Sequence, residues 1–120
     1  MSRLRVSCLA LLCTVASAMA GADESGKLED LLKRAIAAST QGSCPAELMS
    51  PLLRSTCENQ QPSIGQRLTS LGKVSSLSFM GMQDTPNGPA EVYRVKHERG
   101  QTTWMINTDS KGKIVVLWFQ

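Results

Sequence analysis

The feature that most constrains this chain is the pattern of apolar and polar residues between Glu91 and Gln120. Three β-rich runs in this segment are separated by two short turns that contain Gly. Apolar residues at every second position predict strands with one buried face, and short turns favour antiparallel neighbours. We therefore expect three strands that fold back on one another, at Val92–Glu98, Thr102–Thr108 and Lys113–Phe119.

The first of these hairpins has one register that sorts its side chains by polarity. If Arg99-Gly100 forms a two-residue turn, Glu98 faces Gln101 and the apolar residues of both strands share one face. A slip by one residue would destroy this sorting. The pairs expected on the apolar face are Tyr93 with Ile106, Val95 with Trp104, and His97 with Thr102.

The last strand differs from its neighbours because it is apolar at both parities from Ile114 to Phe119. A three-residue loop would place Trp118 beside Trp104, and a four-residue loop would place Leu117 there. Either way one apolar row points away from the helices. This row is typical of a central strand covered on both faces, or of a pocket, dimer face or partner surface. The candidate residues for such a face are Tyr93, Trp104, Leu117 and Trp118.

The segment upstream shows helical periodicity. A helix over Lys27–Thr40, capped by Ser25, has one apolar stripe and stops at Gln41-Gly42. Ser50-Pro51 is typical of a helix start, so we expect one or two short turns between Pro45 and Thr56. After a polar loop at Glu58–Pro62, Ser63 and Gln66 form a capping-box pattern for a helix over Ile64–Leu71 that ends at Gly72.

A fourth strand is expected at Lys73–Met82, followed by a loop over Gln83–Ala90. The turn Thr85-Pro86-Asn87-Gly88 lies within this loop, where Pro fixes one backbone angle. A loop of this length at a sheet edge is either a plain connection or a recognition element.

The N-terminus has the pattern of an export signal. Arg3 and Arg5 precede an apolar run, and Ala18-Met19-Ala20 matches the small-x-small cleavage pattern. The run is about half the ~20 residues needed to span a bilayer. We interpret residues 1–20 as a cleaved signal peptide and 21–120 as a single domain, periplasmic or secreted, without a stable membrane anchor. The formal charge of +3 includes both arginines, so it does not indicate a nucleic-acid partner.

Two of the four cysteines, Cys8 and Cys13, fall within the predicted signal. Cys44 and Cys57 remain, and an exported chain meets an oxidising compartment, so we predict a disulfide between them. Closing a loop of this length stabilises a fold by about 3 kcal/mol. A catalytic thiol or a metal site are the competing interpretations. A metal would need more ligands than these cysteines and His97 offer, so no metal or cofactor is expected.

No residue pattern predicts catalysis. His97 is the only histidine, and no acid or nucleophile is placed to work with it. Asp84 and Asp109 lie in expected turns, where Asp is favoured for local reasons.

The segment from Leu71-Gly72 to the C-terminus resembles small exported bacterial domains of the cystatin-like/NTF2-like kind, which also occur as accessory domains of β-lactamase-type hydrolases. The residues that carry the resemblance are Leu71-Gly72, Val92-Tyr93-Arg94-Val95, Trp104-Met105-Ile106 and the turn from Asp109 to Ile114. The resemblance implies an α+β fold, in which a long N-terminal helix and short helices pack on a four-stranded antiparallel meander, often with a pocket between them. The chain lacks the acidic pocket residues usual in NTF2-like proteins.

These observations favour a non-enzymatic exported binding or accessory domain, which uses a sheet face or pocket to bind a protein, a small ligand or a second copy. One alternative is an inhibitor or immunity protein for an exported enzyme, with contacts at Gln83–Ala90 and Arg99-Gly100. Another is a small isomerase or dehydratase, which would need an ionisable residue such as His97 inside a cavity.

Overall fold

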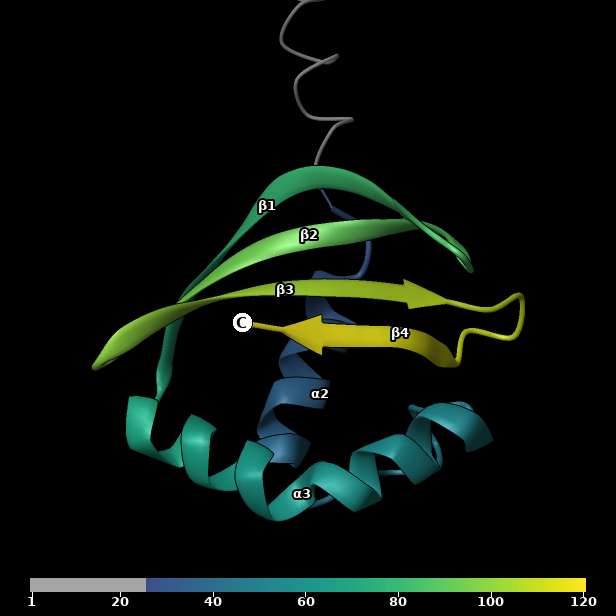
Figure 1. Ribbon diagram of the computed structural model, residues 1–120. Coiled ribbons are helices and arrows are strands. Elements are labelled where there is room, and N and C mark those ends of the chain that lie inside the picture. Colours follow the sequence, from purple (N-terminus) through teal and green to yellow (C-terminus); the bar gives the residue numbers. More distant parts are fainter. Residues whose placement is uncertain (1–25) are drawn as a thin grey trace, which may run out of the picture.

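The computed structural model describes residues 26–120, so the predicted signal peptide and the Ser25 cap lie outside the described residues. Within that range the chain forms an α+β domain with two helices and one antiparallel meander in the order β1-β2-β3-β4 (Figure 1). This confirms the predicted class. The elements are α2 (Glu29–Thr40), α3 (Pro51–Leu71), β1 (Val74–Thr85), β2 (Gly88–His97), β3 (Gly100–Thr108) and β4 (Ile114–Phe119).

The helices cover one face of a curved sheet. In Figure 1, α2 passes behind the strands, and α3 crosses below the edge strand β4. The longer helix is α3, with 21 residues, whereas the N-terminal α2 has 12. The core forms where the apolar stripe of α2 meets the covered face of the sheet. Its most deeply buried members include Leu32, Ala35, Tyr93, Val95, Trp104, Ile106 and Ile114.

The first turn of α2 is held by a strand residue. The backbone N–H groups of Lys27 and Leu28 each donate to the Glu91 carboxylate at 2.9 Å. The Tyr93 hydroxyl donates to the same carboxylate at 2.6 Å. Gly26 packs so tightly against Tyr93 that a Cβ at this position would collide with its ring. A buried carboxylate on β2 thus fixes the start of α2, which begins two residues later than predicted.

Helix α3 corrects the prediction of short turns, a loop at Glu58–Pro62 and a separate helix from Ile64. Ser50 is its N-cap, as predicted, and accepts from the N–H of Leu53. The helix then continues through Pro62 to Leu71. Proline removes only one helical N–H donor, and the residues around it are largely exposed, so water can satisfy the freed carbonyl. Buried side chains on both sides of Pro62, Cys57 and Leu68, hold the helix in place.

The first hairpin corrects the predicted loop over Gln83–Ala90. Strand β1 continues to Thr85, which pairs directly with Gly88, so that only Pro86 and Asn87 form the turn. The Thr85 hydroxyl donates to the Gly88 carbonyl and accepts from the Asn87 N–H, and Gly88 has a φ of 98°. These local bonds make a tight turn where composition alone predicted a loop.

The register between β2 and β3 differs from the prediction by two residues. His97 pairs with Gly100, so Glu98 and Arg99 form the turn, and Tyr93 pairs with Trp104. The turn is fixed from outside the hairpin, because Glu98 N–H donates to the Lys73 carbonyl and Arg99 N–H donates to the Leu71 carbonyl. A two-residue slip preserves the faces, so Val95 and Trp104 remain together on the buried side.

Neither predicted register of the last hairpin is correct. The residues between Thr108 and Ile114 form a longer loop, and Trp104 pairs and stacks with Phe119 at 4.3 Å between ring centroids. A register shift between Asn107 and Thr108 accompanies the change. The Asp109 carboxylate accepts backbone N–H groups from Lys111 and Lys113, which explains the loop in local terms.

The predicted disulfide is confirmed. Cys44 and Cys57 are bonded, with 6.0 Å between their Cα atoms. The bond joins the segment before α3 to the first half of that helix. Neither described helix is long and apolar enough to cross a membrane.

Candidate functional site

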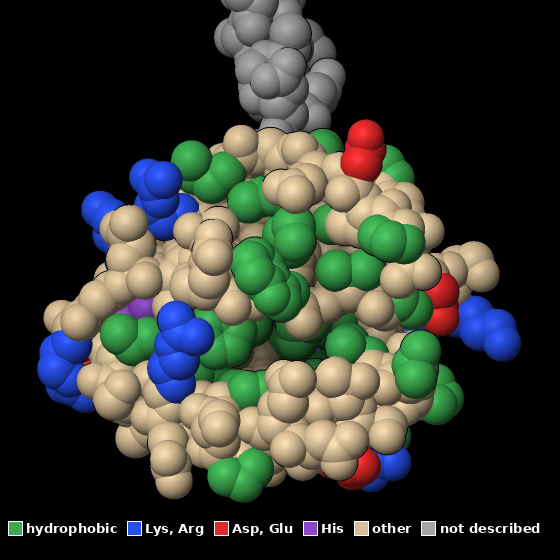
Figure 2. Space-filling model, in the orientation of Figure 1, with side chains coloured by type: hydrophobic (Ala, Val, Ile, Leu, Met, Phe, Trp, Pro, Cys, Tyr) green, Lys and Arg blue, Asp and Glu red, His purple; other side chains and the backbone are tan. Residues whose placement is uncertain are grey.

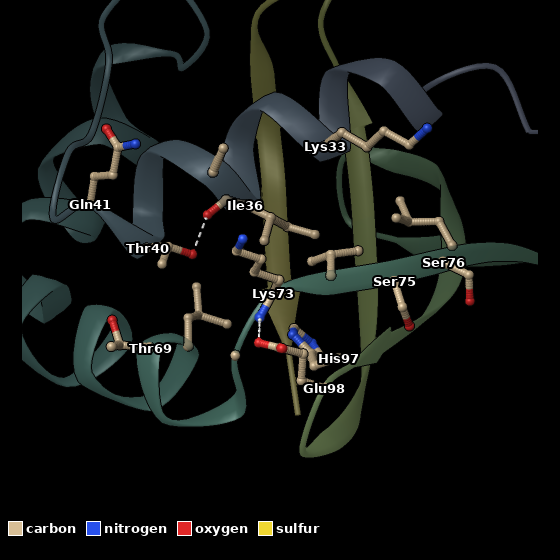
Figure 3. Close-up of a pocket in the computed structure, with 15 residues that line it drawn as sticks. Lys33, Ile36, Thr40, Gln41, Thr69, Lys73, Ser75, Ser76, His97 and Glu98 are labelled. Atoms are coloured by element: carbon tan, nitrogen blue, oxygen red, sulfur yellow. Dashed lines mark hydrogen bonds between the residues drawn. The ribbon is translucent and has the colours of Figure 1, made fainter.

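A hollow in the described part of the chain lies between α2, the end of α3, the start of β1 and the β2–β3 turn (Figure 3). Its volume is about 670 Å³, which is within the range of small-molecule sites. We call it the His97 pocket. Its lining combines apolar and polar residues: Lys33, Ile36, Ala37, Thr40, Gln41, Leu68, Thr69, Gly72, Lys73, Val74, Ser75, Ser76, Leu77, His97 and Glu98.

His97 is the pocket residue with an unmet hydrogen-bonding group. Its side chain is 7% exposed, and Nε2 lies 2.8 Å from the Thr102 hydroxyl. Trp104 Nε1 donates to the same hydroxyl oxygen, also at 2.8 Å. Nδ1 is buried and has no partner within residues 26–120. Native proteins rarely leave a buried polar atom unpaired, because its desolvation costs about 1–3 kcal/mol.

Charged side chains lie at the mouth of the pocket. Lys73 N–H donates to the Glu98 carboxylate at 2.9 Å, and in Figure 3 the Lys73 side chain extends toward α2. Lys33 on α2 is paired with Glu29 at 3.3 Å. Lys73 has no ion pair among the described residues, so it is the cation that remains free to meet a ligand.

A second, shallower hollow of about 620 Å³ meets the His97 pocket at Thr40, Gln41 and Thr69. Gln61 lies beneath it and is 9% exposed. Its amide Nε2 donates to Cys57 Sγ, and its Oε1 has no partner in the described region. Each of the two hollows thus has one lining residue with a buried polar atom that lacks a partner in the described region, His97 on β2 and Gln61 on α3.

The residues predicted as a pocket or partner face are split by the structure. Tyr93 and Trp104 are buried against the helices and present no free surface. Trp104, Leu117 and Trp118 border a smaller hollow of about 280 Å³ between α3 and β4, where the Arg67 guanidinium lies 4.9 Å from the Phe119 ring centroid. Trp118 is 49% exposed, and its ring belongs to the other side of the sheet from Trp104.

The sheet face opposite α2, here called the open face, carries an apolar row across the strands. Val92, Met105 and Trp118 are paired in register, and Met80 lies beside them on β1. Met80 and Trp118 are each about half exposed. Figure 2 shows apolar side chains gathered over the middle of this face, with Lys and Arg side chains around them, on the left and at the right edge.

The remaining predicted residues have local roles. Pro86 and Asn87 form the tight β1–β2 turn between Thr85 and Gly88, and Asn107 Nδ2 donates to the Asn87 carbonyl. Asp109 is bonded within its own loop. Among residues 26–120, no three His, Cys, Asp or Glu side chains gather in a way that could hold a metal.

The sequence reasoning missed the His97 pocket. The sequence predicts no functional role for Lys73, Ser75, Ser76 or Leu77, and it offers His97 only as a catalytic residue without a partner or as a metal ligand without enough companions. A signal was present, because Glu91 and His97 occupy inward positions of a strand that is otherwise apolar on that face. A polar residue at an inward position needs a hydrogen-bond partner. Glu91 and His97 are distinguished when the partners of each side chain are identified.

No protein-family model, curated protein or solved structure matches this chain.

Proposed function

We propose that this protein is a small, exported, non-enzymatic domain that binds an apolar small molecule in the His97 pocket. The observation that carries the proposal is the buried His97 Nδ1 without a partner, at the side of a hollow of ligand size. Apolar walls from α2, α3 and β1 supply binding surface, and the few polar groups supply orientation, which is the usual composition of a small-molecule site.

The proposal includes a location and a fold relationship. We propose that residues 1–20 are a signal peptide and that the domain acts in the periplasm or outside the cell. The Cys44–Cys57 bond supports this location, because disulfides persist in oxidising compartments. The four-stranded meander with a helix on one face also supports a cystatin-like or NTF2-like relationship. The mass of the protein recovered from the exporting host tests cleavage after Ala20.

Binding is favoured over catalysis by the arrangement of ionisable groups. His97 lies in a cavity, as an enzyme of this size would need, but its Nε2 is bonded to Thr102. Glu98 is the carboxylate that lines the pocket, and it accepts the Lys73 N–H. Neither group is paired with the other as an acid and a base.

A fragment screen by two-dimensional NMR tests the pocket. We expect fragments with apolar rings or chains to shift the amide resonances of Ile36, Leu68 and Leu77. Ala37→Trp, at an exposed position that lines the pocket, should abolish these shifts by filling the mouth. Ala46→Trp, at an exposed position in the turn before α3, is the matched control and should leave them intact. Fragments that bind equally well to both variants would refute the proposal.

A second candidate is favoured by the apolar row on the open face. Arg94 and Lys96 are the charged residues beside this row on β2, so the matching partner would be a protein with an apolar patch and an acidic rim. Met105→Lys should abolish such binding, and Ser55→Lys, on the exposed side of α3, should not. An inhibitor or immunity protein would instead lose its target when Pro86 at the β1–β2 tip is replaced by Ala.

A further inference from the structure

The Thr102 hydroxyl links two side chains whose hydrogen-bonding roles can be assigned. The indole Nε1–H of Trp104 can only donate, so Thr102 Oγ1 is its acceptor. Thr102 is 2% exposed, and a buried hydroxyl hydrogen needs an acceptor of its own. The acceptor within reach is His97 Nε2, 2.8 Å away. The proton of the neutral His97 ring must then be carried by Nδ1.

His97 lines this pocket, and the bond between its Nε2 and Thr102 fixes Nδ1 as the ring atom that carries the N–H donor. Nδ1–H has no acceptor among the described residues, and the free ammonium group of Lys73 belongs to the same pocket. Ile36, Leu68 and Leu77 contribute apolar side chains to the lining of this pocket. Nδ1 is itself buried, so a ligand oxygen reaches it only when side chains of the pocket around His97 shift.

We infer that the Trp104–Thr102–His97 hydrogen-bond chain makes the His97 pocket selective for apolar molecules that carry a carboxylate. This inference rests on the proposed function and adds the ligand class to it. A carboxylate oxygen can accept from Nδ1–H while Lys73 balances its charge, and the hydrocarbon part lies on the apolar side chains of the lining. A primary ammonium group has no lone pair to offer, so it leaves Nδ1–H unpaired and meets Lys73 as a like charge. In this tautomer Nδ1 can donate a hydrogen bond to the ligand but has no lone pair with which to accept one.

Three probes of equal chain length test the ligand class. We expect octanoate to bind the purified protein at least about tenfold more tightly than octylammonium, with octanamide between them, by NMR titration. Long-range ¹H–¹⁵N correlation of the imidazole reports the tautomer, and assignment is unambiguous because the chain has one histidine. The expected result is a proton on Nδ1.

Two variants of Thr102 separate a positioning role from a structural one. Thr102→Ser keeps the hydroxyl and should keep both the tautomer and the preference for octanoate. Thr102→Val keeps the shape, removes the hydroxyl, and should shift the proton toward Nε2 while reducing the preference to less than about threefold. Chemical shifts of the backbone amides show whether each variant remains folded.

The outcomes distinguish this inference from the proposed function. Equal affinity for the three probes at the pocket would overturn the carboxylate preference and leave pocket binding standing. A proton on Nε2 in the unsubstituted protein would overturn the hydrogen-bond chain whatever binds. If none of the three probes shifts the pocket resonances, the inference is wrong, and the fragment screen decides separately whether the pocket binds anything.

Discussion

Strand β2 carries two buried polar side chains on the same face, six residues apart, and they are treated differently. Glu91 accepts from two backbone N–H groups and from the Tyr93 hydroxyl. His97 uses one ring nitrogen and leaves the other without a partner. Both are less than 10% exposed, so burial alone does not separate them. The difference teaches that a saturated buried group holds the fold together, whereas an unsaturated one retains capacity for something outside it.

The largest expected effect is the loss of stability on replacing Glu91, the buried group whose hydrogen bonds are all made. Glu91→Ala removes the acceptor for three donors and should reduce the free energy of unfolding by about 3 kcal/mol. Glu91→Gln keeps one acceptor oxygen and should lose about half as much. Urea titration followed by tryptophan fluorescence measures both. Glu58→Ala, an exposed carboxylate paired with Arg54, is the control and should change stability by less than about 0.5 kcal/mol. A similar loss of stability for Glu58→Ala would refute the prediction that Glu91 stabilises the fold through its buried hydrogen bonds.

The second effect concerns pH. Burial, reinforced by the bonded Glu91 carboxylate, raises the pKa of Tyr93 above its ordinary value of about 10. The protonated phenol is therefore favoured in the folded state, and its stabilising contribution is complete below pH 10. Above pH 10 the unfolded chain releases this proton and the folded protein does not, so stability should fall by about 1.4 kcal/mol per pH unit.

Tyr93→Phe isolates this slope, because it keeps the ring and the edge contact with Phe79. The variant should be about 1 kcal/mol less stable at neutral pH and should lack the additional alkaline loss. Tyr93 is the only tyrosine, so ultraviolet absorbance follows its ionisation directly. If stability falls equally with rising pH in the two proteins, the hydrogen bond to Glu91 and burial do not hold the Tyr93 proton.

The third effect concerns His97, the buried group with an unpaired nitrogen, and its replacement should change the free energy of unfolding only slightly. His97→Leu removes the unpaired Nδ1–H, which offsets the lost bond to Thr102, so unfolding should change by less than about 1 kcal/mol. Octanoate binding, by contrast, should weaken at least about tenfold. A loss of stability as large as that for Glu91→Ala would make His97 a second structural residue and would remove the reason to place a site there.

Much of the fold could be predicted from local patterns. The Ser50-Pro51 helix start, the Gly72 stop and the strand parity of β2 and β3 all follow from neighbouring residues. The disulfide followed from the count of cysteines that remain after the predicted signal. These features depend on interactions that are short in sequence, or on a choice with only one partner available.

The errors are of two kinds. The β2–β3 register and the continuity of α3 depend on contacts distant in sequence, whereas the β1–β2 and β3–β4 turns depend on side-chain bonds within the turn itself. The β2–β3 register moved by two residues because Lys73 and Leu71 bind the turn from outside the hairpin. Helix α3 runs through Pro62 because Cys57 and Leu68 are anchored on either side of it. The β3–β4 register depends on a loop whose length Asp109 sets through its own side chain.

The site was the least predictable part because its residues are far apart in the chain. The pocket joins α2, the end of α3 and the β2–β3 turn, and the sequence does not show that these meet. What the sequence did show was an apolar last strand, and this drew attention to Trp118 instead. The buried histidine became informative only once its two nitrogens could be examined separately.

The smallest effect tests whether the His97 pocket favours a negatively charged ligand. Glu98 is exposed and lies beside the proposed ligand carboxylate, so its charge should weaken octanoate binding slightly. Glu98→Gln keeps an acceptor for the Lys73 N–H and should strengthen octanoate binding by about threefold, with stability almost unchanged. Glu47→Gln, exposed in the turn before α3, is the matched control and should have no effect, as measured by the same NMR titration. If Glu98→Gln weakens octanoate binding instead, the carboxylate of Glu98 helps to hold the ligand. The His97 end of β2 would then favour a donor, which is the opposite of the selectivity that the Thr102 hydrogen bonds imply.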